Sequence, residues 1–539
     1  MLQLLLGGSG SGKTTLLYQR IRARAEKGEK SILLVPEQFT SSTEGRIYRE
    51  LGDALSGMVE SFSFTSLAEK ILSTEGGAAV QTLSDAGRAV LVRRALEELQ
   101  DNVHYYHRHR RSAAFCQMAA QTIDELKSAG LSGRQLAQLA GACGAESGKL
   151  SELALIFQGY ETLLARSGMD PSDRLELAGA RLEEALARHS LPEFLRDRAV
   201  FIDEFDTFNA PKKRLLGAML AALPSVTVAL CDDGAPLLPG DLSLFSGAKQ
   251  VAAQLRQLAR KNGAEVAVPQ LLRKDLRHRN APGLAAVAEL LETGSCTADA
   301  PAGEVRLFAA PSREEEARAA AGAIRRLMRQ GVRCGKIAVV CRDIAKYRAA
   351  VRYEFRMAEI PLYCDEPTTP EFSAPATAVR ALLEIARGAD LTENLTTLAK
   401  TGLCALSEEQ VCALENYAYT WAPTAAAWRE KFERSPKGFG EQELTEEDLR
   451  NRERAEHARA LLVGAVDAFR AKVRGVNAEA ISRAVYFCLK TLGAEEQQAA
   501  QVKAIRAGRG IPAAEEAARE WNVVMGLLDE MARLLGTQT

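Results

Sequence analysis

The chain begins with an apolar run that leads directly into a glycine-rich loop, MLQLLLGGSGSGKTTLLYQR. Residues 7–14 satisfy the pattern G-x-x-x-x-G-K-[ST], the signature of a phosphate-binding loop. Such a loop needs a strand before it and a helix after it, because backbone N–H groups and a helix N-terminus must converge on one anion. Residues 2–6 are apolar enough for a buried strand, and residues 14–27 carry Leu and Ile at helical spacing. The motif therefore predicts an α/β domain at the start of the chain.

The residue types in this loop indicate phosphate and magnesium chemistry. Glycine lets the backbone turn its N–H groups inward onto phosphate oxygens. Lys13 would reach the β- and γ-phosphates of a nucleotide, and the hydroxyl of Thr14 would hold Mg²⁺. The residues that we expect to surround the phosphates are Gly7, Gly8, Ser9, Gly10, Ser11, Gly12, Lys13, Thr14 and Thr15.

An acidic pair follows a second apolar strand, in the stretch AVFIDEFD. Asp203 at the end of such a strand can hold Mg²⁺ through water, and Glu204 can orient or deprotonate an attacking water. Acidic pairs are common on solvated surfaces, so the phosphate-binding loop elsewhere in the chain is what favours this role. We therefore expect Asp203 and Thr14 to share the metal ion, and Lys13, Asp203 and Glu204 to act catalytically.

Strand and helix signals divide the chain into an interrupted α/β domain, a second α/β unit and helical regions. Residues 1–82 and 191–295 carry the strand signals of a first α/β domain, and residues 83–190 between them are helical in pattern. A second α/β unit is expected over residues 304–388. Residues 389–539 show helical patterns almost throughout and are predicted to be a helical insertion or tail.

The second unit begins with EVRLFAAPSREEEARAAAGAIRRLMRQGVRCGKIAVVCRD, which predicts a strand, a helix and another strand. Ser312 and Glu315 fit a capping box at the start of that helix. Arg342 directly follows the second apolar strand. An arginine there could cross a cleft between domains and contact the γ-phosphate, or it could be a surface arginine; the sequence leaves both open.

Composition excludes some classes of protein. The 539 residues contain 69 Lys and Arg against 70 Asp and Glu, so any nucleic-acid surface must be local. The ten cysteines form no C-x-x-C pair, which argues against a metal site built from local pairs and indicates free thiols in a reducing cytoplasm. No apolar span reaches the length of a membrane helix. We expect a soluble cytoplasmic protein without a membrane partner.

The order of several segments resembles one bacterial family. After the glycine-rich loop come VPEQFT, SFTSLAEKIL, FIDEFDTFNAPKKRLL and, in the second unit, IAVVCRDIAKYRAAV and IPLYCDEP. This order resembles AddB (RexB), one of the two components of the AddAB (RexAB) helicase–nucleases, from residue 1 to about residue 390. The resemblance implies a superfamily 1 helicase-like α/β fold with two RecA-like domains and helical insertions.

The resemblance also implies a function. Family members pair with an AddA-type subunit as a heterodimer in the bacterial cytoplasm, process double-stranded DNA ends for recombinational repair and respond to Chi-type sequences. By this analogy ATP and Mg²⁺ would be the cofactors, and Lys13, Thr14, Asp203, Glu204 and Arg342 would carry the ATP chemistry. The helicase domain of AddB proteins is regarded as largely structural, whereas AddA drives translocation.

This sequence departs from the family pattern in four ways. It shows neither the G-x-I-D-R-x-D nuclease signature nor the cysteine set of a [4Fe–4S] cluster, and family members are much longer. VALCDDGAP lacks the glutamine that active superfamily 1 motors place after their G-D turn. We expect an N-terminal fragment or a truncated gene product, without nuclease activity and without the cluster in this portion.

Two stretches are candidates for contact with single-stranded DNA. HYYHRHRR, residues 104–111, combines aromatic and cationic side chains that suit base stacking and phosphate pairing, although a solvated helix face is the plainer interpretation. The segment after PEQF supplies hydroxyls that could contact phosphate. The candidate residues are Thr40, Ser41, Tyr105, Tyr106, Arg108, Arg110 and Arg111.

Two other functions remain open from the sequence. One is a kinase or transferase of the same loop class acting on a small molecule, which the helical region and the second α/β unit disfavour because such enzymes need one α/β domain. The other is a catalytically inert scaffold that binds an AddA-type subunit and DNA. ATP turnover in the presence of DNA distinguishes these from a working motor.

Overall fold

The computed structural model describes residues 1–77, 81–142, 144, 147–295, 304–364, 370–440 and 443–536. Its first part is an α/β domain built on one six-stranded parallel sheet with the strand order β3-β2-β4-β5-β1-β6. The strands are β1 Leu2–Gly7, β2 Ser31–Leu34, β3 Val59–Phe62, β4 Ala199–Ile202, β5 Ser225–Cys231 and β6 Gln270–Leu272. Because all strands are parallel, their carboxyl ends share one edge of the sheet.

The sheet is buried on both faces, which explains why its strands read as nearly continuous apolar runs. Side chains alternate across β1: Leu5 packs with Leu17 and Ile21 on one face, whereas Leu4 and Leu6 belong to the core on the other. The first face is covered by α1 Lys13–Ala25 and α2 Thr40–Leu51, and α3 Asp53–Ser56 follows them. The helices that contribute to the second face are α4 Phe64–Glu75, α9 Pro171–Ala187, α10 Ala210–Ala222 and α11 Ser246–Lys261.

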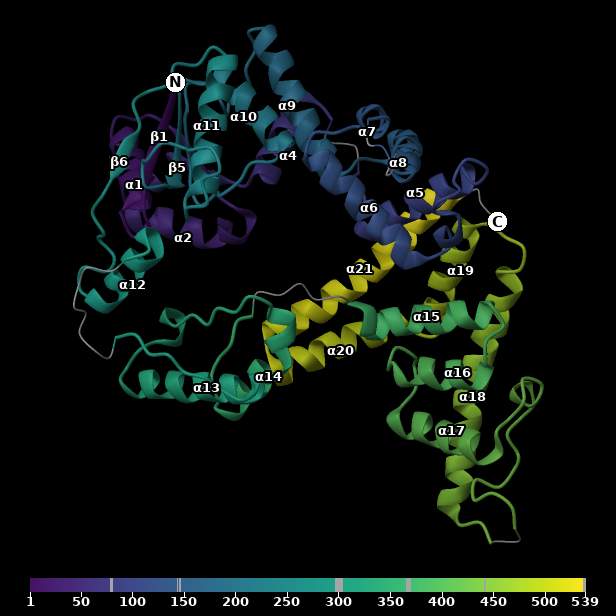
Figure 1. The fold of residues 1–539 in the computed structure, drawn as a ribbon. Coiled ribbons are helices and arrows are strands. Elements are labelled where there is room, and N and C mark those ends of the chain that lie inside the picture. Colours follow the sequence, from purple (N-terminus) through teal and green to yellow (C-terminus); the bar gives the residue numbers. More distant parts are fainter. Residues whose placement is uncertain are drawn as a thin grey trace.

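A helical region separates β3 and α4 from β4 (Figure 1). Its core joins helix α5, Asp85–Glu98, and helix α8, Ser147–Ser167, through residues such as Leu91, Phe157 and Tyr160, each at most 1% exposed. Lys127 bridges Asp170 and Asp173 at 2.8 Å each, and the Tyr160 hydroxyl donates to Asp170 at 2.6 Å. The helices of this region before α9 are α5 Asp85–Glu98, α6 Ala113–Ser128, α7 Gly133–Ala140 and α8 Ser147–Ser167.

The strands expected in the second α/β unit do not form in residues 304–364. Ser312 caps α13 Arg313–Arg329 by accepting a hydrogen bond from the N–H of Glu315, but Glu315 pairs with Arg318 at 2.6 Å instead of completing the expected capping box. Helix α13 packs on α14 Ile344–Met357. The apolar segments flanking α13 instead run without strand pairing, and Leu307 and Val340 are 102% and 92% exposed. A strand needs hydrogen-bonded neighbours, and the described residues supply none to these segments. The two strands predicted on either side of α13 are therefore absent from residues 304–364 of the structure.

The remainder of the described chain is helical and has its own core around the fully buried Trp428. Its long last helix, α21, leaves this core, where Val524 packs, and reaches the first helical region, where Leu534 is buried. The helices are α15 Ala374–Ala386, α16 Leu391–Lys400, α17 Glu408–Trp421, α18 Glu446–Lys472, α19 Ala478–Thr491, α20 Ala494–Arg509 and α21 Ile511–Leu535.

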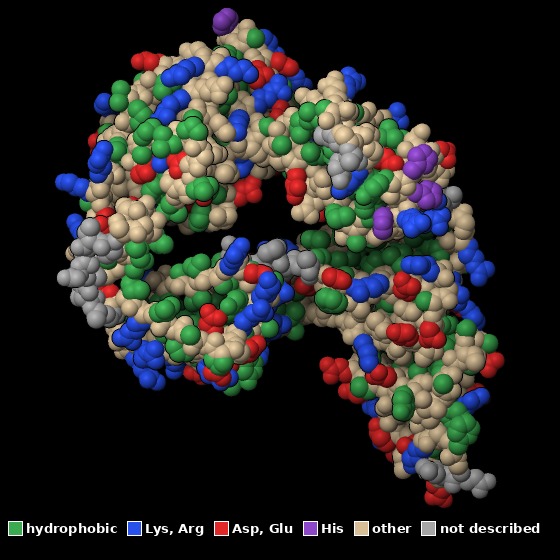
Figure 2. Space-filling view, in the orientation of Figure 1, with side chains coloured by type: hydrophobic (Ala, Val, Ile, Leu, Met, Phe, Trp, Pro, Cys, Tyr) green, Lys and Arg blue, Asp and Glu red, His purple; other side chains and the backbone are tan. Residues whose placement is uncertain are grey.

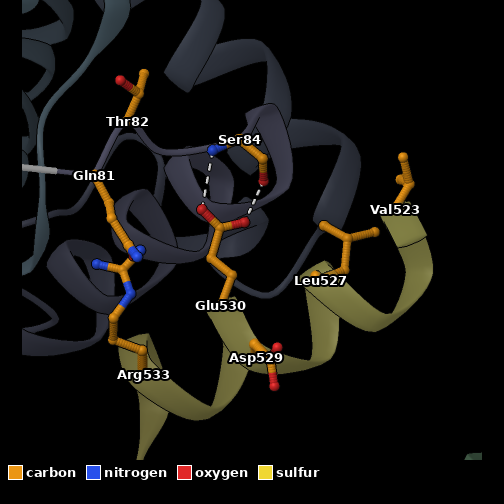
Figure 3. Close-up of a pocket in the computed structure, with 9 residues that line it drawn as sticks. Gln81, Thr82, Ser84, Val523, Leu527, Asp529, Glu530 and Arg533 are labelled. Carbon is orange, nitrogen blue, oxygen red and sulfur yellow. Dashed lines mark hydrogen bonds between the residues drawn. The ribbon is translucent and has the colours of Figure 1, made fainter. Parts of the chain in front are cut away.

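A polar junction fixes α21 against α5 (Figure 3). The Glu530 carboxylate accepts a hydrogen bond from the N–H of Ser84 at 2.9 Å and another from its hydroxyl, so it caps the first turn of α5. Arg94 on α5 donates to the carbonyl of Leu534 at 2.8 Å. A cavity of about 670 Å³ beside these contacts is lined by residues of both segments. These contacts join the last helix of the second helical region, α21, to the first helix of the first helical region, α5.

Candidate phosphate-binding site

The glycine-rich loop lies at the carboxyl edge of the sheet, between β1 and α1. Gly10 and Gly12 have φ angles of +77° and +90°, a region that L side chains rarely adopt. Gly12 immediately precedes the first residue of α1, Lys13. These conformations turn the loop around the N-terminus of the helix, where backbone N–H groups and the helix dipole favour an anion.

The polar groups inside the loop fit a phosphate ligand. The Lys13 ammonium donates to the carbonyls of Gly7 and Gly8 at 2.8 and 2.9 Å, so its side chain folds over the loop. Ser11 is 6% exposed, and its hydroxyl has no hydrogen-bond partner among the described residues. An unsatisfied buried hydroxyl costs about 1–3 kcal/mol. The loop therefore keeps a buried polar atom whose hydrogen bonds a ligand oxygen can supply.

The structure brings the predicted metal pair together. Asp203 directly follows β4, its N–H donates to the carbonyl of Leu34 at 3.1 Å, and its carboxylate lies close to the Thr14 hydroxyl. Burial raises the pKa of Asp203, while the neighbouring Thr14 hydroxyl and the charge of Lys13 lower it. Thr14 and Asp203 thus provide a hydroxyl and a carboxylate, the hard oxygen ligands that Mg²⁺ prefers.

Glu204 occupies an unusual backbone conformation beside this pair. Its φ angle is +65°, the left-handed region, and its N–H donates to the Asp203 carboxylate at 3.0 Å. Burial raises the pKa of Glu204, and the neighbouring charge of Asp203 raises it further. A solvent-accessible carboxylate of raised pKa, on a strained backbone at a strand end, is suited to proton transfer.

Two arginines at the site were missed by the sequence analysis. Arg46 on α2 places its guanidinium 4.8 Å from the ring centre of Tyr18, and its charge lowers the pKa of both Asp203 and Glu204. Arg277 follows β6 and donates to the hydroxyl of Ser9 at 3.3 Å. The available signals were a basic stretch, RKDLRHR, and a helix that starts directly after PEQF; neither specifies contact with the loop.

The structure does not bring Arg342 to the loop. Arg342 is exposed in the turn before α14. In the ribbon view α13 and α14 lie apart from α1, and the space-filling view shows an opening between the α/β domain and the helices below it (Figures 1 and 2). Its expected contact with the γ-phosphate stays a prediction.

The candidate DNA-contact residues lie at two separate places. Thr40 begins α2, and its hydroxyl donates to the carbonyl of Glu37 at 3.0 Å; the side chain of Ser41 lies outside the described part of the molecule. Residues 104–111 form turns with the short 3-10 helix His107–His109, not the solvated helix face that was the plainer interpretation. Figure 2 shows histidine and basic side chains gathered together over part of the molecule.

The turn at residues 104–111 is fixed by hydrogen bonds to Glu152 on α8. The Glu152 carboxylate accepts hydrogen bonds from the N–H groups of His104, Tyr105 and Tyr106, the shortest at 2.7 Å. Tyr106 packs on Phe115 with ring centres 5.1 Å apart, whereas Tyr105 is 61% exposed. Arg108 and Arg111 are exposed, and Arg110 is half-buried. One aromatic face and several cations are therefore displayed to solvent on a fixed backbone.

Comparison with known proteins decides the family. The family model described as "ADDB, N-terminal" matches residues 4–288, which include the loop, the acidic pair and Arg277. The chain belongs to the AddB family. The match covers nearly all of the parallel sheet, so the α/β domain just described is the characteristic N-terminal part of AddB proteins.

Individual AddB relatives agree. A protein of Desulforudis audaxviator, named as a subunit of an ATP-dependent helicase/deoxyribonuclease, is 30% identical over 100% of this chain and 48% of its own length. The proteins of the same name from Moorella thermoacetica and Geobacillus kaustophilus are 30% and 29% identical, over 47% and 48% of their lengths. The chain spans about half the length of the curated relatives that it matches. None of its described helices combines the length and apolarity needed to cross a membrane.

Proposed function

We propose that the chain is the nucleotide-binding, DNA-contacting part of an AddB protein that works with an AddA-type partner at double-stranded DNA ends. The observation that carries the proposal is the meeting of Thr14 and Asp203 beside a phosphate-binding loop in which the buried Ser11 hydroxyl has no partner among the described residues. The names of the relatives, which describe parts of helicase/deoxyribonucleases, support the wider role.

The residues of the loop would act in a defined way. Lys13 would exchange the carbonyls of Gly7 and Gly8 for phosphate oxygens of a bound nucleotide. Thr14 and Asp203 would hold the magnesium ion of Mg·ATP, which would neutralise charge on the phosphates. Glu204, whose pKa is raised, accepts a proton from an attacking water. Arg277, already bonded to Ser9, contributes a positive charge beside the phosphates.

The DNA contacts are proposed for the turn at residues 104–111 and for the start of α2. Tyr105 offers an exposed ring for stacking on an unpaired base, and Arg108 and Arg111 can pair with phosphates. A second RecA-like domain that includes α13 and α14, the bacterial cytoplasm as location, and a response to Chi-type sequences complete the proposal by analogy with the family.

ATP hydrolysis by this chain, with and without single-stranded DNA, tests the proposal beside Lys13→Ala. DNA-stimulated turnover that Lys13→Ala abolishes would show a working motor site. Nucleotide binding at background turnover would support the inert-scaffold alternative, which is favoured by the separation from the loop of α14, the helix that follows Arg342 (Figure 1). Turnover that depends on a small-molecule acceptor and ignores DNA would instead establish the kinase or transferase alternative.

A further inference from the structure

The chain crosses the phosphate-binding loop again after β6. The N–H of Leu276 donates to the carbonyl of Gly10 at 3.0 Å, and the Arg277 side chain reaches Ser9. A methyl group added at Gly12 would lie 3.1 Å from Leu276 Cδ1, so this side chain rests on the loop. We call residues 273–278 the strap. The strap leads into helix α12, Pro282–Thr293.

The last turn of α12 presents a carboxylate to the loop. A methyl group added at Gly8 would lie 2.7 Å from Glu292 Oε1 and 3.3 Å from Oε2, so both oxygens of Glu292 face the Gly8 backbone. Burial raises the pKa of the Cys231 thiol at the end of β5, and the charges of Lys13 and Glu292 act on that thiol in opposite directions. Both charges act on the Cys231 thiol, so Lys13 and Glu292 lie at the same edge of the sheet.

An anion at this position has a physical reason. The loop directs N–H groups and the positive end of the α1 dipole toward its centre. The carboxyl end of α12 carries the opposite partial charge, and Glu292 adds a full negative charge to it. A loop built for phosphate thus faces an anion that belongs to the same chain.

We propose that the Glu292 carboxylate stands in for a nucleotide phosphate in the ligand-free chain, so that Mg·ATP and Mg·ADP bind in competition with the end of α12. This inference rests on the proposed nucleotide function. A phosphate bound by the loop would bring its charge close to the Glu292 carboxylate beside Gly8, and like charges at a shared site disfavour each other. Nucleotide binding therefore selects the fraction of molecules in which α12 has moved away.

Helix α12 is suited to such movement. Gly283 and Ala286 are its buried residues, whereas Leu290 and Leu291 are 48% and 67% exposed. A helix that buries so little apolar surface has a low cost of local displacement. The contacts of the strap with the loop can persist while the last turn of α12 moves, because they involve residues that precede the helix.

Equilibrium binding of Mg·ADP to four forms of the chain tests the inference: wild type, Glu292→Gln, the matched control Glu289→Gln and Lys13→Ala. Glu292→Gln keeps the shape of the side chain and removes its charge, and Glu289→Gln removes the same charge one turn earlier on α12. If nine-tenths of the free chain is in the occluded form, Glu292→Gln tightens binding by about tenfold. Glu289→Gln should bind as wild type does, and Lys13→Ala should bind weakly.

The outcomes separate the inference from the function on which it rests. Equal affinity of wild type and Glu292→Gln, together with a loss of binding in Lys13→Ala, would overturn the role of Glu292 and leave the nucleotide site intact. An equal gain in Glu289→Gln would also overturn it, because the effect would then be one of general charge. Absence of Mg·ADP binding in wild type and Glu292→Gln alike would overturn the nucleotide function itself.

Discussion

Replacing Ser11 with alanine should stabilise the chain without ligand and weaken its response to nucleotide. Its hydroxyl is buried and has no partner among the described residues, a condition that costs about 1–3 kcal/mol. Alanine removes that cost and leaves the φ and ψ angles of the position accessible. At the lower limit, a gain of about 1 kcal/mol raises the melting temperature of a domain of 150–250 residues by ~2–4 °C.

With nucleotide bound, the same substitution should have the opposite effect, because it reduces the stability that the ligand adds. A ligand oxygen that satisfies Ser11 stabilises wild type more than Ser11→Ala, so saturating Mg·ADP should shift the melting temperature less in the variant. Differential scanning fluorimetry with and without Mg·ADP measures both effects. Ser9→Ala, at an exposed position of the same loop, is the control: it removes only the exposed 3.3 Å hydrogen bond from Arg277 and should change the ligand-free melting temperature little. A Ser11→Ala chain that melts below wild type without ligand would refute the reasoning.

Three further changes test other parts of the structure. Asp203→Asn should be more stable than wild type at neutral pH. Burial raises the pKa of Asp203 in the folded chain, so ionising this carboxylate as the pH rises costs stability that asparagine does not lose. The difference in unfolding free energy, measured by urea titration at several pH values, should vanish in acid. Lys127→Ala leaves buried Asp170 without its cation and should cost about 3–5 kcal/mol of unfolding free energy, measured in urea; a loss under about 1 kcal/mol would contradict the burial argument. Changing Arg108 and Arg111 to Ser should weaken single-stranded DNA binding and flatten its salt dependence in fluorescence anisotropy, and an unchanged slope would exclude this turn as the contact.

Much of the α/β domain follows from the sequence because local pattern and tertiary structure agree there. β1, β2, β4 and β5 are buried on both faces, and their apolar runs mark them directly. β6 was not predicted, because three half-buried residues of mixed polarity carry too little signal. The strands expected around α13 failed for a different reason: apolar extended segments become strands only where partners exist to pair with them.

The candidate site divides in the same way. Thr14 and Asp203 could be paired in advance because Thr14 begins the helix after the glycine-rich loop and Asp203 directly follows β4, both at the carboxyl edge of a parallel sheet. Arg277 contacts Ser9 across a separation of 268 residues, and Glu292 meets Gly8 only through the path of the strap. The hydrophobic periodicity of the sequence carries no information about such long-range contacts. The conformation of Glu204 is likewise visible only in the folded backbone.

The most direct measurement of the central claim is the magnesium dependence of nucleotide binding, by calorimetric titration of ADP with and without Mg²⁺ into wild type, Lys13→Ala and Asp203→Asn. We expect Mg²⁺ to tighten ADP binding to wild type, Asp203→Asn to bind ADP without the magnesium effect, and Lys13→Ala to lose binding in both conditions. Wild-type binding that is unaffected by Mg²⁺, or a full magnesium effect in Asp203→Asn, would contradict the assignment of Thr14 and Asp203 as the metal pair.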